Sequence, residues 1–235
     1  SYEIWNDFTY DHVMWTRSEI LYDKNTLEEY FGSKILKQTN EIDLLSNIKK
    51  DENGNVYLDA EVLSIEANPN CEHQLKQINP NYMITFLGQQ EGTTDFYTPK
   101  DNPTCTGGST YLEQTSWYNE TEVQKLPIIT LDSLNQQFDF IKMDVQGAEL
   151  DIIKGGLKTI LDASVLQLEL GVLNYNQGAP RASEIISYLY SLDFHLFDIG
   201  SFFYWDGRLN QSDMFFVNTR KFPNFGDIFE AYRNR

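Results

Sequence analysis

With 235 residues, the chain is long enough to bury the core of one α/β domain and too short for a second large domain. Its 18 basic and 35 acidic residues give a net charge of −17, which argues against nucleic acid as a partner. Two cysteines and three scattered histidines predict free thiols and no bound metal. Because we find no apolar run long enough to span a membrane and no signal-peptide pattern, we expect a soluble, cytoplasmic protein without membrane insertion.

The first 50 residues carry apolar side chains at helical spacing, so the sequence predicts a helical N-terminal extension over 1–50. The apolar positions form two successive faces: Ile20, Leu27, Tyr30 and Phe31, then Ile35, Leu36, Ile42, Leu45 and Ile48. The segment DENGN at 51–55 predicts a turn. From this turn to residue 235 we expect one Rossmann-like α/β domain.

Two short apolar segments that each end in an acid follow the turn. Residues 56–59 (VYLD) and 61–66 (EVLSIE) both predict buried strands, yet only Ala60 separates them. Parallel neighbours need a crossover of about a dozen residues. Two interpretations stay open: one long strand, or a crossover segment that is missing near 59–61. We favour the second, because loss of a crossover would leave the remaining strands without their organising order.

The middle of the chain predicts short strands joined by polar loops. Residues 81–97 indicate two strands around a turn near Glu91 and Gly92. Residues 98–118 are polar and predict a loop that either covers a site or only connects strands. A short strand is expected at 128–131.

The segment FDFIKMDVQGAELDIIKGG, residues 138–156, has the pattern of a strand, a tight loop and a helix. Its apolar strand ends at Asp144, and in open α/β sheets ligands bind at such strand ends. Lys142 inside the strand needs an acidic partner. Glu149, in the first helical turn, is explained by the helix dipole without a catalytic role. One helix is expected from the apolar residues Leu150, Ile152, Ile153, Leu157, Ile160 and Leu161.

The last part of the chain continues the alternation of strands and helices. A buried strand at 164–170 carries Glu169 near its end, a helix begins at Ser183, and a strand follows at 194–199. A final hairpin is expected over 202–217. This order predicts an α/β fold with a Rossmann-like sheet, mostly parallel with an antiparallel last strand, and helices on both faces.

The segment LPIITLDSLNQQFDFIKMDVQGAELDIIKGG, residues 126–156, closely resembles the one that marks the FkbM-like family of S-adenosylmethionine (SAM)-dependent O-methyltransferases. The similarity extends more loosely to SIEANP (64–69), TGGSTYLEQT (106–115) and LQLELGVLNYNQG (166–178). The resemblance implies a SAM-methyltransferase sheet and SAM as cofactor. It also implies methyl transfer to a hydroxyl of a small molecule or glycan, with a sugar or glycan as the expected acceptor class. The oligomeric state stays open.

The resemblance further implies which residues form the site. It assigns the ribose of SAM to the strand-end acid Glu66, a role that such acids have in nucleotide-binding α/β folds. The implied cofactor-binding residues are Asp59, Glu66, Ala67, Leu87, Gly88, Gln89, Asp144, Val145 and Gln146. A hydroxyl acceptor also needs a group that takes its proton. The candidate general bases are Asp144, which ranks first, and Glu169.

One feature of the family is not found in this sequence. The family's first strand runs into a glycine-rich D-x-G-A-N-x-G loop, which has no counterpart here. Besides the missing segment, an alternative is therefore a non-catalytic methyltransferase-like module that lacks the SAM loop and serves in binding or scaffolding. An NAD-dependent oxidoreductase is a weaker third hypothesis, because the chain has no G-x-G-x-x-G motif.

Overall fold

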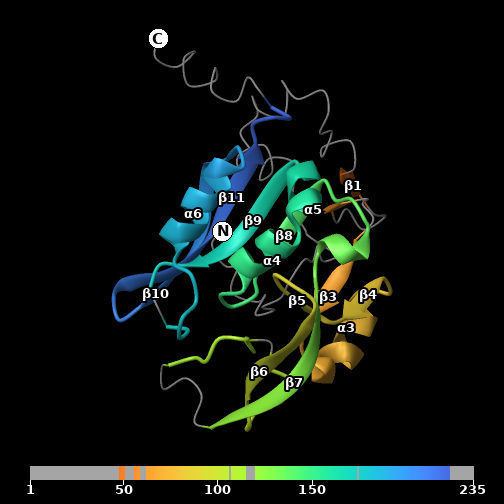
Figure 1. Cartoon of the computed structure of the whole chain (residues 1–235), viewed down its shortest axis with the longest axis vertical. Helices are drawn as coiled ribbons and strands as arrows, with labels where there is room; N and C mark the ends of the chain where they lie inside the picture. The colour runs from red at the N-terminus through yellow and green to blue at the C-terminus, as the bar shows by residue number, and fades with distance from the viewer. Residues whose placement is uncertain are drawn as a thin grey trace.

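The computed structural model describes residues 48–50, 56–58, 62–105, 107–114, 120–173 and 175–222 (Figure 1). The expected helical extension lies outside these residues up to position 47. Its last apolar residue, Ile48, is not helical: β1 (Ile48–Lys50) pairs antiparallel with β2 (Val56–Leu58), and Ile48 lies opposite Leu58. The prediction of a helix at Ile48 is therefore wrong, because the pairing with β2 takes the place of a last helical turn.

The segment 56–59 was expected to be a parallel neighbour of the strand that ends at Glu66. Instead β2 pairs with β1, and β3 (Ser64–Glu66) pairs parallel with β4 (Tyr82–Ile84). Only residues 59–63 lie between β2 and β3, too few for the crossover of about a dozen residues that parallel neighbours require. The join at Asp59, Ala60 and Glu61 itself lies outside the described residues.

The extended segment 82–87 pairs with two different strands, first with β3 and then with β7 (Thr121–Ile129). After η2 (Pro69–Cys71) and α3 (Glu72–Ile78), β4 runs beside β3, and the Thr85 amide donates to the Glu66 carbonyl at 2.9 Å. Beyond Thr85, β5 (Phe86–Leu87) pairs parallel with the end of β7. The chain at 82–87 therefore joins two small sheets and carries its end towards the rest of the molecule.

A long hairpin extends from β5. β6 (Gly92–Pro99) pairs antiparallel with β7 over eight residues, and η3 (Asp132–Leu134) follows. The turn near Glu91 and Gly92 is confirmed. The strand expected at 128–131 begins earlier, at Thr121, because its polar first half stays half-exposed and gains its hydrogen bonds from β6.

The C-terminal half forms a four-stranded sheet in the order β10-β11-β9-β8. β8 (Phe140–Met143) and β9 (Val165–Gly171) are parallel, and β11 (Arg208–Asn218) runs antiparallel between β9 and β10 (Phe194–Trp205). The antiparallel last strand is thus confirmed. The strand expected at 194–199 continues without interruption into the first strand of the expected hairpin. Both belong to β10, because bulges let β10 stay paired with β11 along its length. α6 (Ala182–Ser191) contacts β10 and begins one residue before Ser183.

The single, mostly parallel sheet that the sequence predicts is not what the described residues form. Their hydrogen-bonded strands fall into four groups, with three parallel and four antiparallel pairs. The mixed α/β class is confirmed. The Rossmann-like arrangement with helices on both faces stays a prediction. No helix in the described part of the chain is long and apolar enough to cross a membrane.

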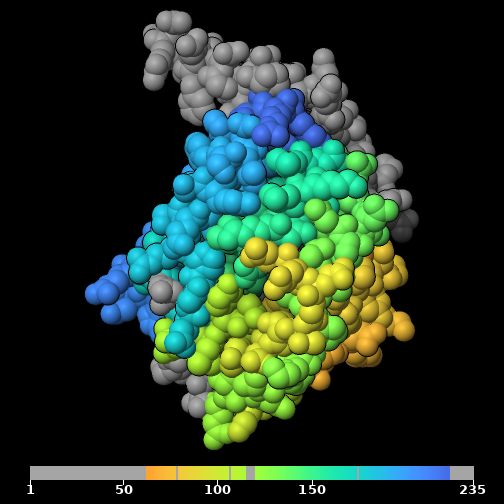
Figure 2. All heavy atoms as spheres, viewed as in Figure 1, coloured from red at the N-terminus to blue at the C-terminus, as the bar shows by residue number. Residues whose placement is uncertain are grey.

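Glycines allow close packing between the C-terminal half of the chain and the strands before it, where α4 (Glu149–Gly155) contacts β5. A β-carbon at Gly155 would overlap the Gly88 carbonyl oxygen. The next glycine, Gly156, ends α4 before α5 (Leu157–Asp162), so the one helix expected here is two. A side chain at Gly156 would press on Leu131. Figure 2 shows the yellow segment that includes β4 and β5 against the green and teal helical segment.

We predict that Gly155→Ala destabilises the fold. In a helix this change ordinarily stabilises by about 1 kcal/mol, but here the added methyl meets a backbone oxygen. We expect a loss of about 2 kcal/mol in the free energy of unfolding, the scale of an overpacked core, measured by urea denaturation. Gly171→Ala is the control, since its methyl would make an ordinary contact 3.4 Å from the Leu173 carbonyl oxygen. Equal stability of both variants would contradict the close approach.

Candidate functional site

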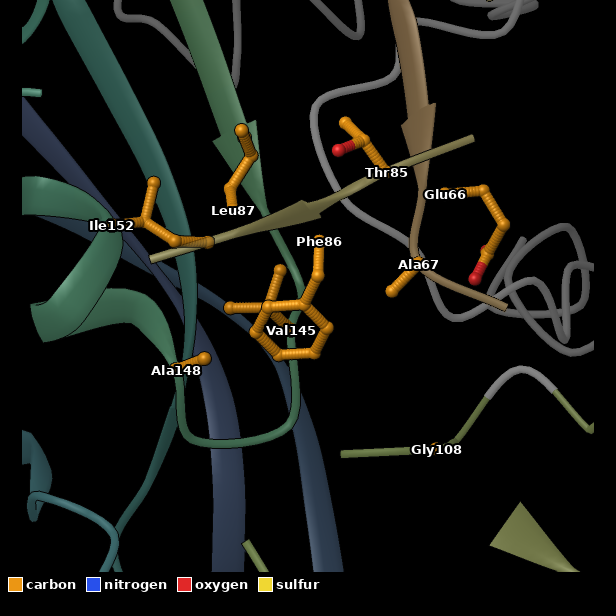
Figure 3. A pocket seen from close by; sticks show the side chains of 9 residues that line it. All are labelled: Glu66, Ala67, Thr85, Phe86, Leu87, Gly108, Val145, Ala148 and Ile152. Carbon is orange, nitrogen blue, oxygen red and sulfur yellow. The ribbon is translucent and has the colours of Figure 1, made fainter. Parts of the chain in front are cut away.

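A small pocket lies between the two halves of the molecule, at the carboxyl ends of β3 and β5 (Figure 3). The strand ends supply Glu66 and Leu87, and Val145 comes from the loop that joins β8 to α4. The full lining is Glu66, Ala67, Thr85, Phe86, Leu87, Gly108, Val145, Ala148 and Ile152. The wall is thus mostly apolar with one carboxylate, a combination typical of sites for small organic ligands.

Glu66 is the acid of this pocket and is only 3% exposed. One of its carboxylate oxygens accepts a hydrogen bond from the Asn68 amide at 2.6 Å. Asn68 in turn donates its side-chain amide to the carbonyls of Pro103 and Cys105, which ties the strand end to the following loop. Burial, together with the charge of Glu66, raises the pKa of the nearby Cys71 thiol to about 12. The free thiol predicted at Cys71 is confirmed, and it is unreactive because the thiol stays protonated.

The loop between β8 and α4 makes a tight turn. Gln146 adopts a φ of 52° and Gly147 a φ of 103°, so a non-glycine residue is held in the sparsely populated left-handed region. Glu149, 2% exposed, accepts hydrogen bonds from the amides of Val145 at 3.2 Å and Gly147 at 3.3 Å. This carboxylate therefore fixes the turn from inside, which is more than the helix-dipole role expected from the sequence.

The side chain of Gln146 lies among the strand-end acids. Its amide nitrogen is 3.1 Å from a carboxylate oxygen of Asp144 and 3.4 Å from one of Glu169. Its amide oxygen accepts from the Tyr175 hydroxyl at 3.3 Å. Glu169 also accepts a hydrogen bond from the side-chain amide of Gln211. One amide thus joins the two candidate general bases.

Asp144 is buried, with 3% of its surface exposed, and the Lys142 ammonium lies 3.9 Å from its second carboxylate oxygen. The acidic partner expected for Lys142 is therefore confirmed. The opposite charge offsets part of the cost of burying the Asp144 carboxylate. A buried carboxylate next to a cation and an amide donor has a fixed position, which general base catalysis requires.

The polar loop after β6 connects the pocket to the acids. Gly108 lines the pocket, and a β-carbon there would lie 2.5 Å from the Phe96 ring. The next residue, Ser109, donates its hydroxyl to the Gln146 carbonyl at 2.8 Å, and Asn176 donates to the same carbonyl at 2.7 Å. The loop therefore covers the site and does not merely connect strands.

The structure separates the predicted cofactor residues into two groups. Glu66, Ala67, Leu87 and Val145 line the pocket. Asp144 and Gln146 lie among the acids, Gly88 is packed on Ile128 and Gly155, and Gln89 is exposed. Asp59 lies outside the described residues.

Five lining residues were missed by the sequence analysis: Thr85, Phe86, Gly108, Ala148 and Ile152. Phe86 and Ile152 are apolar residues of a strand and a helix, so nothing in their pattern distinguishes a pocket wall from core. The glycine pair at 107–108 was the one available signal, because glycine permits close approach in a loop. Among the described residues, no group of three or more His, Cys, Asp or Glu is placed to hold a metal ion.

A comparison with protein-family models matches residues 34–196 to the Methyltransferase FkbM domain. The match includes both the pocket and the turn at Gln146, and it ends before β11. Neither the curated proteins nor the solved structures gave a match to this chain.

We predict that Glu149 makes the stability of the fold depend on pH. Burial raises the pKa of Glu149 from 4.5 to about 7. The backbone hydrogen-bond donors oppose this rise, and the negative charge of Asp144 adds to it. A carboxyl whose pKa is raised on folding stabilises the protein below its unfolded pKa and loses this contribution as the pH rises through its folded value. The free energy of unfolding should therefore decrease between about pH 5 and about pH 8, by on the order of 3 kcal/mol.

Glu149→Gln is the matched control for this prediction, because an amide stays neutral and its oxygen can still accept both backbone hydrogen bonds, which reach the same oxygen of Glu149. Urea denaturation of both proteins across this pH range isolates the contribution of the one carboxyl. The wild type should lose stability relative to the variant as the pH rises. Parallel profiles would show that Glu149 is ionised in the folded protein throughout.

Proposed function

Because the chain belongs to the FkbM methyltransferase family, we propose that it transfers a methyl group from SAM to a hydroxyl of a sugar or glycan. The observation that carries the proposal is the joining of a mostly apolar pocket with one acid, Glu66, to a pair of carboxylates, the buried Asp144 and the partly buried Glu169, through a single loop. Methyl transfer to a hydroxyl needs both parts: a place for the donor and a group that takes the proton.

The residues of the pocket fit the adenosine end of SAM. A carboxylate at the end of β3 can accept hydrogen bonds from both hydroxyls of a ribose, the role assigned to Glu66. Phe86, Leu87 and Ile152 offer an apolar wall for an adenine ring. Gly108 also lines the pocket, and its position admits no side chain, because a β-carbon there would meet Phe96 and Thr98.

When bound, SAM supplies a methyl group that a sulfonium makes electrophilic. The chain's own residues then orient the acceptor and take its proton. Asp144 is the proposed base, because it lies at the strand end next to Val145, which lines the pocket. Glu169 is the second candidate. It accepts two side-chain amide hydrogen bonds, from Gln146 and Gln211, which occupy part of its capacity as an acceptor.

We predict that the protein binds SAM and S-adenosylhomocysteine, as measured by isothermal titration. Glu66→Ala should weaken both at least about tenfold, the scale of losing hydrogen bonds to a charged group. Glu122→Ala is the control, because Glu122 is an exposed acid at the far end of β7. Absence of binding by the wild-type protein would defeat the proposed function and favour the non-catalytic binding or scaffolding module.

We further predict that Asp144→Asn lowers turnover by about two powers of ten, the scale of losing a general base. The affinity for SAM should stay nearly unchanged, since Asp144 does not line the pocket. Single-turnover methylation with radiolabelled SAM measures the first effect and isothermal titration the second. Full activity of Asp144→Asn would move the role of base to Glu169.

A further inference from the structure

Three acids from three neighbouring strands lie in one row across the C-terminal sheet. Met143 of β8 pairs with Leu168 of β9, so the next residues, Asp144 and Glu169, are level with each other. Glu169 pairs directly with Asp213 of β11. Directly paired residues of neighbouring strands point to the same face of a sheet, with β-carbons about 5 Å apart. The side chain of Asp213 therefore lies beside the two candidate bases, on their face of the sheet.

Asp213 differs from the other two acids in its hydrogen bonding. It is 7% exposed, and its Oδ1 atom is buried without a hydrogen-bond partner among the described residues. The neighbours explain this: Glu169 on one side accepts hydrogen bonds, and Gly200 on the other side, paired with Asp213 from β10, has no side chain to donate. A buried acceptor without a donor destabilises the folded state, and each such group needs an explanation.

We propose that Asp213 is an acceptor-positioning residue: with Glu169 it forms a subsite that receives a hydrogen-bond donor of the methyl acceptor, next to the hydroxyl that Asp144 deprotonates. The donor is an N–H or O–H group, because these are the groups that a carboxylate oxygen binds. This inference rests on the proposed methyl transfer for the identity of the ligand. The residue itself lies outside the matched family segment, which ends at 196.

The surroundings of Asp213 favour an organic ligand with several donors. Gln211, two residues earlier on the same face, donates to Glu169 and accepts from the Tyr175 hydroxyl at 2.9 Å. Phe203 pairs with Gln211 from β10 and is 43% exposed, so an aromatic ring stands at the rim of the same face. Polar side chains beside an exposed ring suit a ring compound with hydroxyl or amino groups. A metal ion fits less well, because no three of the described acids are placed to hold one.

The test uses the full-length protein saturated with S-adenosylhomocysteine, and three probes: methyl glucoside, the methyl glycoside of glucosamine, and cyclohexanol. Dissociation constants are measured by saturation-transfer NMR. We expect the wild type to bind at least one glycoside more tightly than cyclohexanol, which has a single donor. Asp213→Leu should weaken that glycoside about tenfold or more, the scale of a lost hydrogen bond to a charged group.

Asp213→Asn distinguishes the two kinds of donor, because it keeps an acceptor oxygen and removes the charge. A hydroxyl ligand should lose no more than about threefold in affinity, whereas an ammonium ligand should lose about tenfold or more. Asp139→Leu is the matched control: Asp139 is exposed and precedes β8, at the end of the strand opposite to the row. It should bind every probe as the wild type does.

Stability gives a second readout that does not depend on the probes. Since the Oδ1 atom of Asp213 is a buried acceptor without a donor among the described residues, Asp213→Leu should unfold at the same urea concentration as the wild type or a higher one. A clear loss of stability would show a structural role and overturn the proposal. Equal glycoside binding by wild type and Asp213→Leu, or no glycoside binding by the wild type, would also overturn it. Failure of S-adenosylhomocysteine to bind refutes methyl transfer instead, and is seen before any glycoside is added.

Discussion

The tight turn at Val145–Gly147 is the constraint on which the site depends. It holds Gln146 in a left-handed conformation that a residue with a side chain adopts only when its surroundings compensate the cost, of order 1–3 kcal/mol. Hydrogen bonds provide this compensation. Glu149 accepts hydrogen bonds from the amides on both sides of Gln146, and Ser109 and Asn176 donate to the Gln146 carbonyl. Four contacts from three separate segments therefore fix one residue.

This conformation sets which groups meet at the site. With its backbone fixed, Gln146 directs its amide to Asp144 and Glu169, and its carbonyl to the covering loop. The adjacent residue Val145 lines the pocket. The apolar pocket and the acids thus have a fixed relation to each other, because the same three-residue turn contributes to both. The close contact of Gly155 with Gly88 serves the same end, since it places α4 against the strand whose end lines the pocket.

Much of this could be predicted from the sequence where the pattern is local. The strand ending at Asp144, the helix after it, the buried strand with Glu169 and the partner of Lys142 all follow from short-range periodicity and from the cost of burying a charge. The pairing of β2 with β1 could not be predicted, because two apolar segments of similar composition give no information on which neighbour each one takes. The break at Gly156 could not be predicted either, because a side chain there would meet Leu131, about 25 residues away in the chain, and no helical pattern contains such a contact.

The roles of individual polar residues show the same limit. The family resemblance implied that Gln146 binds the cofactor, yet in the left-handed turn its side-chain amide joins two acids. Asp213 had no signal at all: it is one acid in a strand near the end of the chain, and only the register with Glu169 places it in the row. Registers between β9 and β11 are set by some forty intervening residues that fold into α6 and β10. A carboxylate row assembled from three strands is therefore a property of the sheet, and the chemistry proposed for it depends on long-range pairing that a linear motif cannot encode.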